Sequence, residues 1–187
     1  MVALFDFADP PSEKYLLLLP ARAYLLQDTT VYLKVLPMPA DTDLIKLYSG
    51  RILDLAADIP HHARLENPMA TVKKRSPLCG SAVTVDVNVE SGKVSAFGQD
   101  VKACALGQAS AAVTGAAVIG RTLPELCDAR DALRAMLKDG GPVPAAPFDG
   151  FEVLEPARDY RNRHASILLC IEATCEAAEA ALRSNCA

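Results

Sequence analysis

Hydrophobic and polar residues alternate most regularly between positions 82 and 89. Every second residue there is a valine, namely Val83, Val85, Val87 and Val89, and polar residues lie between them. This period of two is typical of a strand with one buried face. A turn follows at 90–93, and residues 94–103 predict the second strand of a hairpin, with a bulge near Gly98 where the alternation changes phase. The segment 69–77 predicts a third strand.

Helical patterns surround this hairpin. A helix is predicted from Thr42 to about Ala57, because apolar residues recur on one face, at Leu44, Tyr48, Ile52 and Leu55. A polar, irregular segment follows at 60–68. The order of a helix, antiparallel strands and further helices favours a segregated α+β fold, in which a small antiparallel sheet of about three strands is packed by several α-helices.

Three further helices and a loop complete the predicted fold. Residues 105–119 are rich in alanine and end at Gly120, a residue that commonly stops a helix. Thr122 begins a capping box, a pattern that opens a helix. Residues 139–150 form a loop rich in glycine and proline, and the last helix is predicted over about 166–183.

The first 37 residues differ from the rest of the chain. They hold five of its ten Phe and Tyr residues. A possible strand at 29–36 has no nearby hairpin partner. We expect an N-terminal extension of unknown role over 1–37 and the folded domain over 38–187. Either Met38 is the natural first residue of the protein, or residues 1–37 are a variable N-terminal arm.

Composition and charge narrow the class of protein. The chain has 187 residues, 51% of them apolar, and a net charge of −4. This length and composition predict one domain with a substantial core, and the charge argues against a nucleic-acid partner. The longest apolar run, 15–20, is too short to span a membrane. Without a basic N-terminal region typical of a secretory signal, we expect a soluble, cytoplasmic protein.

Cysteines are the main candidates for chemistry, and none of the six forms a CxxC pair. Without a secretory signal, metal binding or catalysis is favoured over disulfides. Cys79 precedes Gly80, which permits close approach of a ligand. Cys104 lies where a strand ends and a helix begins, so free N–H groups there favour a thiolate. Cys170 lies near the start of the last helix, after a segment with three arginines and His164.

The other candidates are weaker, and each cysteine has a structural alternative, because cysteines are often simply buried. Cys127 lies beside an apolar helix stripe, and Cys186 is at the terminus. Cys175 is five residues after Cys170, so in a regular helix it points about 140° away. The adjacent His61 and His62 predict a solvated loop. His164 is a candidate to reach the cysteine site.

Residues 42–183 contain several short motifs whose order and spacing resemble those of the NifU/IscU-type iron–sulfur cluster assembly scaffolds, including the SufU branch. They are Leu47-Tyr48-Ser49, Glu66-Asn67-Pro68, Pro77-Leu78-Cys79-Gly80, Cys104 before a small-residue helix, Gly120-Arg121-Thr122-Leu123 and Leu169-Cys170.

The resemblance implies a site as well as a fold. Its three cysteine ligands would be Cys79, Cys104 and Cys170, holding a transient [2Fe–2S] cluster or a zinc ion. The implied partners are a cysteine desulfurase and recipient apoproteins, and the protein would not be an enzyme. Soft thiolates suit both cargoes.

Two positions depart from the family pattern. Ser81 stands where the family usually has an aspartate, and Leu169 stands where IscU-type members have histidine before the third cysteine. The Leu-Pro-Pro-Val-Lys chaperone motif is also missing, which favours a SufU-like or divergent branch. His164, Glu172 or water are the alternatives for a fourth ligand.

Three other functions compete with a cluster scaffold. The first is a zinc-binding sulfur acceptor for a cysteine desulfurase. The second is an enzyme in which Cys104 is the nucleophile and His164 its base. The third is a small domain whose cysteines only pack. The metal and sulfide content of protein purified without oxygen separates the scaffold, the zinc protein and the packing domain.

Overall fold

The computed structural model describes residues 49–77 and 79–184. The expected strand at 29–36, the start of the first predicted helix and the boundary between residues 37 and 38 lie outside the described residues. Helix α2 spans Gly50–Ala57 and leads into the strands β1 (Ala70–Arg75), β2 (Ala82–Glu90) and β3 (Lys93–Lys102). The helices α3 (Ala105–Ala117) and α4 (Leu123–Asp139), the 3₁₀ segment η2 (Asp149–Asp159) and α5 (Arg161–Ser184) follow. The α+β prediction is confirmed.

The three strands form one antiparallel sheet in the order β1-β2-β3. The predicted hairpin and third strand are therefore confirmed, but the bulge near Gly98 was misplaced. Asn88 pairs with Ala96 and Val89 with Val94, so the extra residue is Ser95. Gly98 serves another purpose, because a Cβ there would lie 2.5 Å from the carbonyl oxygen of Ala63. Its missing side chain lets the loop before β1 lie against the sheet.

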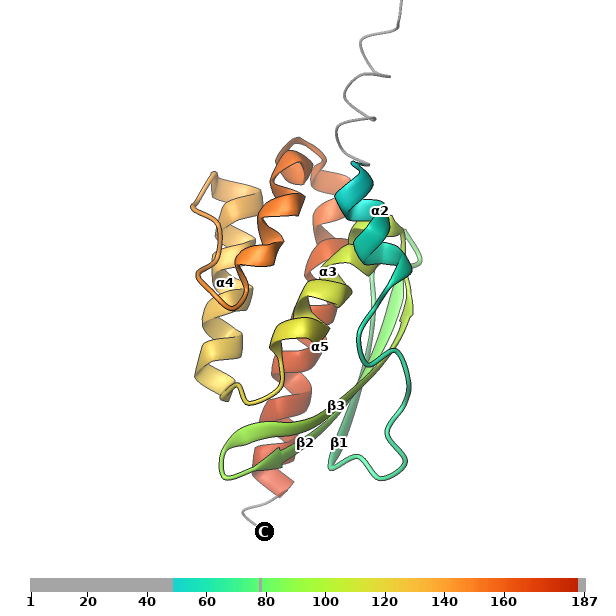
Figure 1. Ribbon diagram of the computed structural model, residues 1–187, viewed down its shortest axis with the longest axis vertical. Helices are drawn as coiled ribbons and strands as arrows, with labels where there is room; N and C mark the ends of the chain where they lie inside the picture. The colour runs from blue at the N-terminus through green and yellow to red at the C-terminus, as the bar shows by residue number, and fades with distance from the viewer. Residues whose placement is uncertain (1–48, 78, 185–187) are drawn as a thin grey trace, which may run out of the picture. The chain divides into compact units, whose positions relative to one another are not determined.

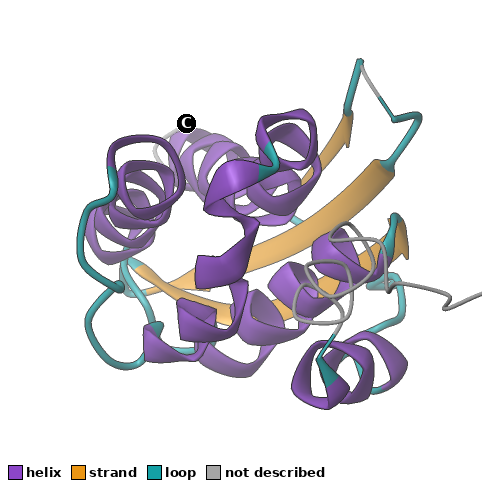
Figure 2. Ribbon diagram, turned by 90° about the horizontal axis from the view of Figure 1, so that it is seen from above, coloured by secondary structure: helices purple, strands orange, loops and turns teal. Residues whose placement is uncertain are grey.

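The helices cover the sheet face that carries the valines. Figure 1 shows α5 and α3 between the sheet on one side and α4 on the other. Figure 2, turned by 90°, shows the strands as a curved band beside the helices. Val85 and Val87 are fully buried, because their alternation turns every second side chain of β2 toward this core.

The opposite face of the sheet is anchored by a buried carboxylate. Asp86 accepts hydrogen bonds from the Arg64 guanidinium, the Thr71 hydroxyl and the Leu65 backbone N–H. The loop that carries Arg64 and Leu65 is thereby fixed to β2. His61 and His62 are exposed in this loop, as predicted.

The helix boundaries differ from the sequence prediction mainly near the C-terminus. The capping box is confirmed, since Thr122 N–H donates to Glu125 at 2.8 Å. By contrast, α5 begins at Arg161, five residues earlier than predicted, and η2 occupies the residues before it. Phe151 and Leu154 of η2 are fully buried. This tertiary packing stabilises a 3₁₀ segment that local pattern does not reveal.

The described helices include none that is both long and apolar enough to cross a membrane.

Candidate functional site

Cys79 lies in the short loop that joins β1 to β2. The loop is closed by a backbone hydrogen bond in which Ser76 N–H donates to the Ser81 carbonyl at 2.8 Å. Gly80 has φ +71°, a conformation that glycine adopts without strain. This tight turn places the Cys79 sulfur 3.3 Å from Ser76 Oγ and 3.1 Å from Ser81 Oγ.

These serine hydroxyls change the acidity of Cys79. Hydroxyls can rotate to donate to a thiolate, which stabilises the charged form of the cysteine. The hydroxyl of Ser76, then the hydroxyl and backbone N–H of Ser81, lower the pKa of Cys79 to about 7, against the opposing effect of burial. The lowered pKa makes this half-buried thiol easier to ionise at neutral pH than an ordinary cysteine, which favours it both as a nucleophile and as a soft metal ligand.

Cys104 lies at the opposite side of the same small site, where β3 gives way to α3. It is the N-cap residue of α3, and its carbonyl accepts the hydrogen bond from Gln108 N–H at 2.9 Å. Its side chain makes no capping hydrogen bond. The sulfur instead lies 3.5 Å from the hydroxyl of Ser166 on α5.

Ser166 connects the two cysteines. Its Oγ lies 3.0 Å from Ser81 Oγ, so a continuous polar chain runs from Cys79 through Ser81 and Ser166 to Cys104. Both serines are buried. Gly107 in the first turn of α3 makes the approach possible, because a Cβ there would lie 2.7 Å from Ser166 Oγ. Sequence reasoning missed Ser166 as a site residue, although a polar residue in an apolar helix segment was a signal.

Cys170 lies elsewhere. It is one turn after Ser166 on α5, but it is buried, and its thiol donates to Gln99 Oε1 at 3.2 Å. The amide nitrogen of Gln99 in turn donates to the carbonyl of Ala111, which is seven residues, or about 10 Å, along α3 from Cys104. Burial raises the pKa of Cys170 to about 12. Its sulfur therefore faces the protein core.

The structure does not bring the three predicted ligands together. Within residues 49–77 and 79–184, no three His, Cys, Asp or Glu side chains are placed to hold one metal ion. Cys79 and Cys104 share a site through two serines, and Cys170 is directed to Gln99. The assignment of these cysteines as metal ligands stays a prediction.

The candidates for a fourth ligand are engaged by other groups. His164 is buried, and its Nε2 lies 3.1 Å from the Ala157 carbonyl and 3.0 Å from that of Arg158. Its Nε2 is thus held by backbone carbonyls, and these contacts give no support to the alternative in which Cys104 is a nucleophile and His164 its base. Glu172 forms ion pairs with Lys74 and Arg134, at 3.3 and 3.0 Å.

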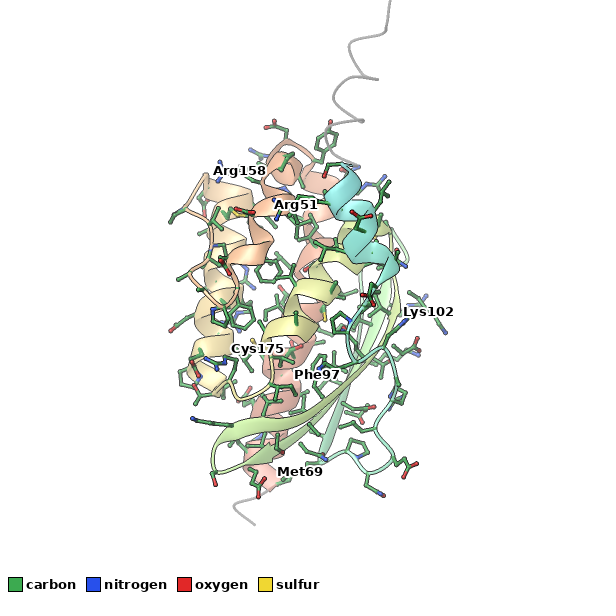
Figure 3. The ribbon with its side chains drawn as sticks, in the orientation of Figure 1. Arg51, Met69, Phe97, Lys102, Arg158 and Cys175 are labelled. Carbon is green, nitrogen blue, oxygen red and sulfur yellow. The ribbon has the colours of Figure 1, made fainter. Side chains whose placement is uncertain are left out.

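Two of the remaining cysteines, Cys127 on α4 and Cys175 on α5, are neighbours of each other. Cys175, labelled in Figure 3, faces Cys127 of α4. Burial raises the pKa of Cys175 to about 12, and a charge on Cys127 raises it further. The Cys175 thiol is therefore protonated at neutral pH, and it is buried on the face of α5 near α4. Cys186 lies outside the described residues.

Comparison with known proteins identifies the family. No protein-family model matches the chain, and neither does any curated protein. Among solved structures, a nitrogen-fixing NifU-like protein (N-terminal) from Brucella abortus is 42% identical, and the match covers 75% of this chain and 98% of that one with a TM-score of 0.73. The chain belongs to the NifU-like family.

A second solved structure supports the fold of this NifU-like chain. It is a protein of thermophilic Fervidobacterium islandicum AW-1, described as an iron–sulfur cluster assembly scaffold for the SUF system. It is 22% identical, with a TM-score of 0.64 over 72% of this chain and 98% of that one. The resemblance to NifU- and SufU-type proteins that the motifs indicated is thus confirmed.

Proposed function

We propose that this NifU-like chain is a scaffold on which an iron–sulfur cluster is assembled and from which the cluster passes to recipient apoproteins. The observation that carries the proposal is the pair of thiols at Cys79 and Cys104, held on one polar chain by Ser81 and Ser166. Membership of the NifU-like family supports the same role. The cluster is cargo here, and the protein turns over no substrate.

Cys79 and Cys104 are the proposed first ligands. Thiolates are the usual ligands of iron–sulfur clusters, and a pKa of about 7 gives Cys79 substantial thiolate character before any metal arrives. Cys170 is the proposed third ligand, and the cargo is a transient [2Fe–2S] cluster. Binding by Cys170 requires that its thiol leave Gln99 and lose a proton against a pKa of about 12. Cys170 therefore completes the site only after the metal supplies positive charge.

Sulfur delivery is the proposed role of Cys79 and of a cysteine desulfurase partner. The Cys79 thiolate attacks the outer sulfur of the desulfurase persulfide, which forms a Cys79 persulfide and releases the desulfurase thiolate. No net oxidation occurs in this exchange. The half-buried Cys79 suits it better than the buried Cys170. We propose the cytoplasm as the compartment, because the site needs reduced thiols.

A zinc-binding sulfur acceptor is the second candidate. It is favoured by the same lowered pKa of Cys79, since zinc also binds thiolates and a sulfur acceptor needs a nucleophilic thiolate. Under this alternative the chain still meets a cysteine desulfurase, but it carries sulfur rather than a finished cluster.

The test is metal and sulfide analysis of the full chain purified without oxygen, after supply of ferrous iron, cysteine and a cysteine desulfurase. Iron with acid-labile sulfide supports the scaffold, and zinc without iron supports the sulfur acceptor. The variants Cys79→Ser and Cys104→Ser should each lose most of the cargo, and Cys127→Ser is the matched control. A folded chain that takes up neither metal, or loses cargo equally with Cys127→Ser, contradicts both functions.

A further inference from the structure

A cavity of about 650 Å³ lies beside the paired thiols. It is lined by the end of β1, the last residues of α4 and the first turns of α5. Ser76, which contacts the Cys79 sulfur at 3.3 Å, forms part of its wall, as does Ala165, the neighbour of Ser166. Its volume is in the range of small-molecule sites, about 300–1,000 Å³.

The cavity carries an excess of positive charge. Arg75, Lys138 and Arg161 come from three different elements, and all three are exposed. None of them forms an ion pair with a carboxylate within the described part of the chain.

The other charged groups around the cavity do not cancel this excess. Lys74 and Glu172 also line it, but they are paired with each other at 3.3 Å, and Glu172 is further bound by Arg134. Asp139 is the remaining carboxylate of the lining. Three cations face one anion, which leaves a net charge of about +2 for a ligand to neutralise.

The remaining walls are apolar, and one helix end adds to the attraction. Pro77, Leu168 and Leu169 line the cavity, so it can also receive carbon atoms of a ligand. The first turn of α5 reaches it through Arg161 and His164. The N-terminal end of a helix carries partial positive charge and favours anions.

We propose that this cavity binds a small organic polyanion, a molecule with a short carbon body and at least two carboxylate or phosphate groups. Its anionic groups lie against Arg75, Lys138 and Arg161, and its carbon atoms lie against Leu168 and Leu169. The cavity volume favours a small molecule over an acidic segment of a partner protein. The inference rests on the lining of the cavity and does not depend on the identity of the cargo.

The test is calorimetric titration of the full-length, reduced chain with citrate and, separately, with inorganic pyrophosphate, at low ionic strength. These two probes distinguish a carboxylate from a phosphate ligand. We expect one site per chain, with affinity that falls as salt is added. The double variant Lys138→Ala with Arg161→Ala should bind at least about tenfold more weakly, because each cation supplies a charge-assisted hydrogen bond.

The matched control removes the same amount of charge far from the cavity. Lys93→Ala with Arg183→Ala changes the first residue of β3 and one residue at the far end of α5, and it should bind as the natural chain does. A second variant, Ala165→Phe, fills the cavity without changing charge and should also abolish binding. Failure of both probes to bind, an equal loss in the control, or binding of an oligoglutamate peptide alone overturns the proposal.

Discussion

The hydroxyl of Ser81, in the loop before β2, lies 3.0 Å from the hydroxyl of Ser166 on α5, although 85 residues separate them. Each serine also lies beside one cysteine sulfur, Ser81 beside Cys79 and Ser166 beside Cys104. The two hydroxyls therefore couple a loop, a helix start and a second helix into one site.

Replacement of Ser166 by alanine should destabilise the fold and loosen the site. The change leaves the buried Ser81 hydroxyl without one partner, which costs about 1–2 kcal/mol. Urea denaturation of the metal-free chain measures the loss. Ser184→Ala, which removes an exposed hydroxyl of the same helix, should change stability by less than about 0.5 kcal/mol. Equal effects of the two substitutions would argue against the polar chain.

Alkylation of Cys79 by iodoacetamide should reach half its maximal rate near pH 7, because its pKa is about 7. Ser76→Ala removes the hydroxyl that contributes most to this low pKa, so the midpoint should move to higher pH. Mass spectrometry of the Cys79 peptide gives the rate at each pH. Ser95→Ala, an exposed serine on β3, is the control. An unchanged midpoint in Ser76→Ala would show that this hydroxyl does not act on the thiol.

Replacement of Gly107 by alanine should destabilise the chain by about 1–3 kcal/mol, as expected for overpacking. Alanine normally favours a helix over glycine, but here its Cβ would lie 2.7 Å from Ser166 Oγ and 2.8 Å from the Ala103 Cβ. Thermal or urea denaturation measures the change. Gly50→Ala is the matched control, because no atom lies within 4 Å of a Cβ built there. If Gly107→Ala is as harmless as Gly50→Ala, the close packing of α3 on Ser166 is not required.

Replacement of Ser81 by aspartate should have opposite effects with and without metal. Ser81 is only 4% exposed, so a carboxylate there loses hydration and lowers the stability of the metal-free chain by about 1–3 kcal/mol. With iron or zinc bound, the metal charge attracts the carboxylate, and loss of metal to a chelator should slow. Equal or faster loss would mean that position 81 does not face the metal.

Replacement of Asp86 by asparagine should lower the stability of the fold. It should also make that stability less sensitive to acid. Burial acts to raise the pKa of Asp86, but hydrogen bonds from Arg64, Thr71 and the Leu65 N–H prevail and lower it. A lowered pKa means that the carboxylate stabilises the fold above its unfolded-state pKa, and that this stability is lost as the pH falls through the folded-state value.

Asp86→Asn should therefore cost about 2–4 kcal/mol at pH 7, and the difference from the natural chain should shrink in acid. Urea denaturation from pH 7 down to pH 3 tests this. Glu90→Gln, at the exposed end of β2, is the control. A difference that stays constant with pH would show that the charge of Asp86 is not what anchors the loop.

Local sequence patterns determined most of the fold. The alternating valines of β2, the turn before β3 and the capping box at Thr122 act over a few residues, so their structures follow from side-chain period and backbone hydrogen bonding. The same local reasoning drew attention to Cys79 and Cys104, because each lies at the boundary of an element. It misplaced the bulge, which falls at Ser95, since the close approach of Ala63 to Gly98 is a tertiary contact.

Only the tertiary structure decided how the last helix contributes to the site. The sequence placed Cys170 near its start, but α5 begins at Arg161, and its packing turns Ser166 toward Cys104 and Cys170 toward Gln99. The same packing directs His164 to the carbonyls that precede α5. The contacts of Ser166 with Cys104 and of Cys170 with Gln99 join residues 62 and 71 positions apart. The free energy of burying each side chain against its distant neighbours sets the position of the helix, and no local pattern encodes it.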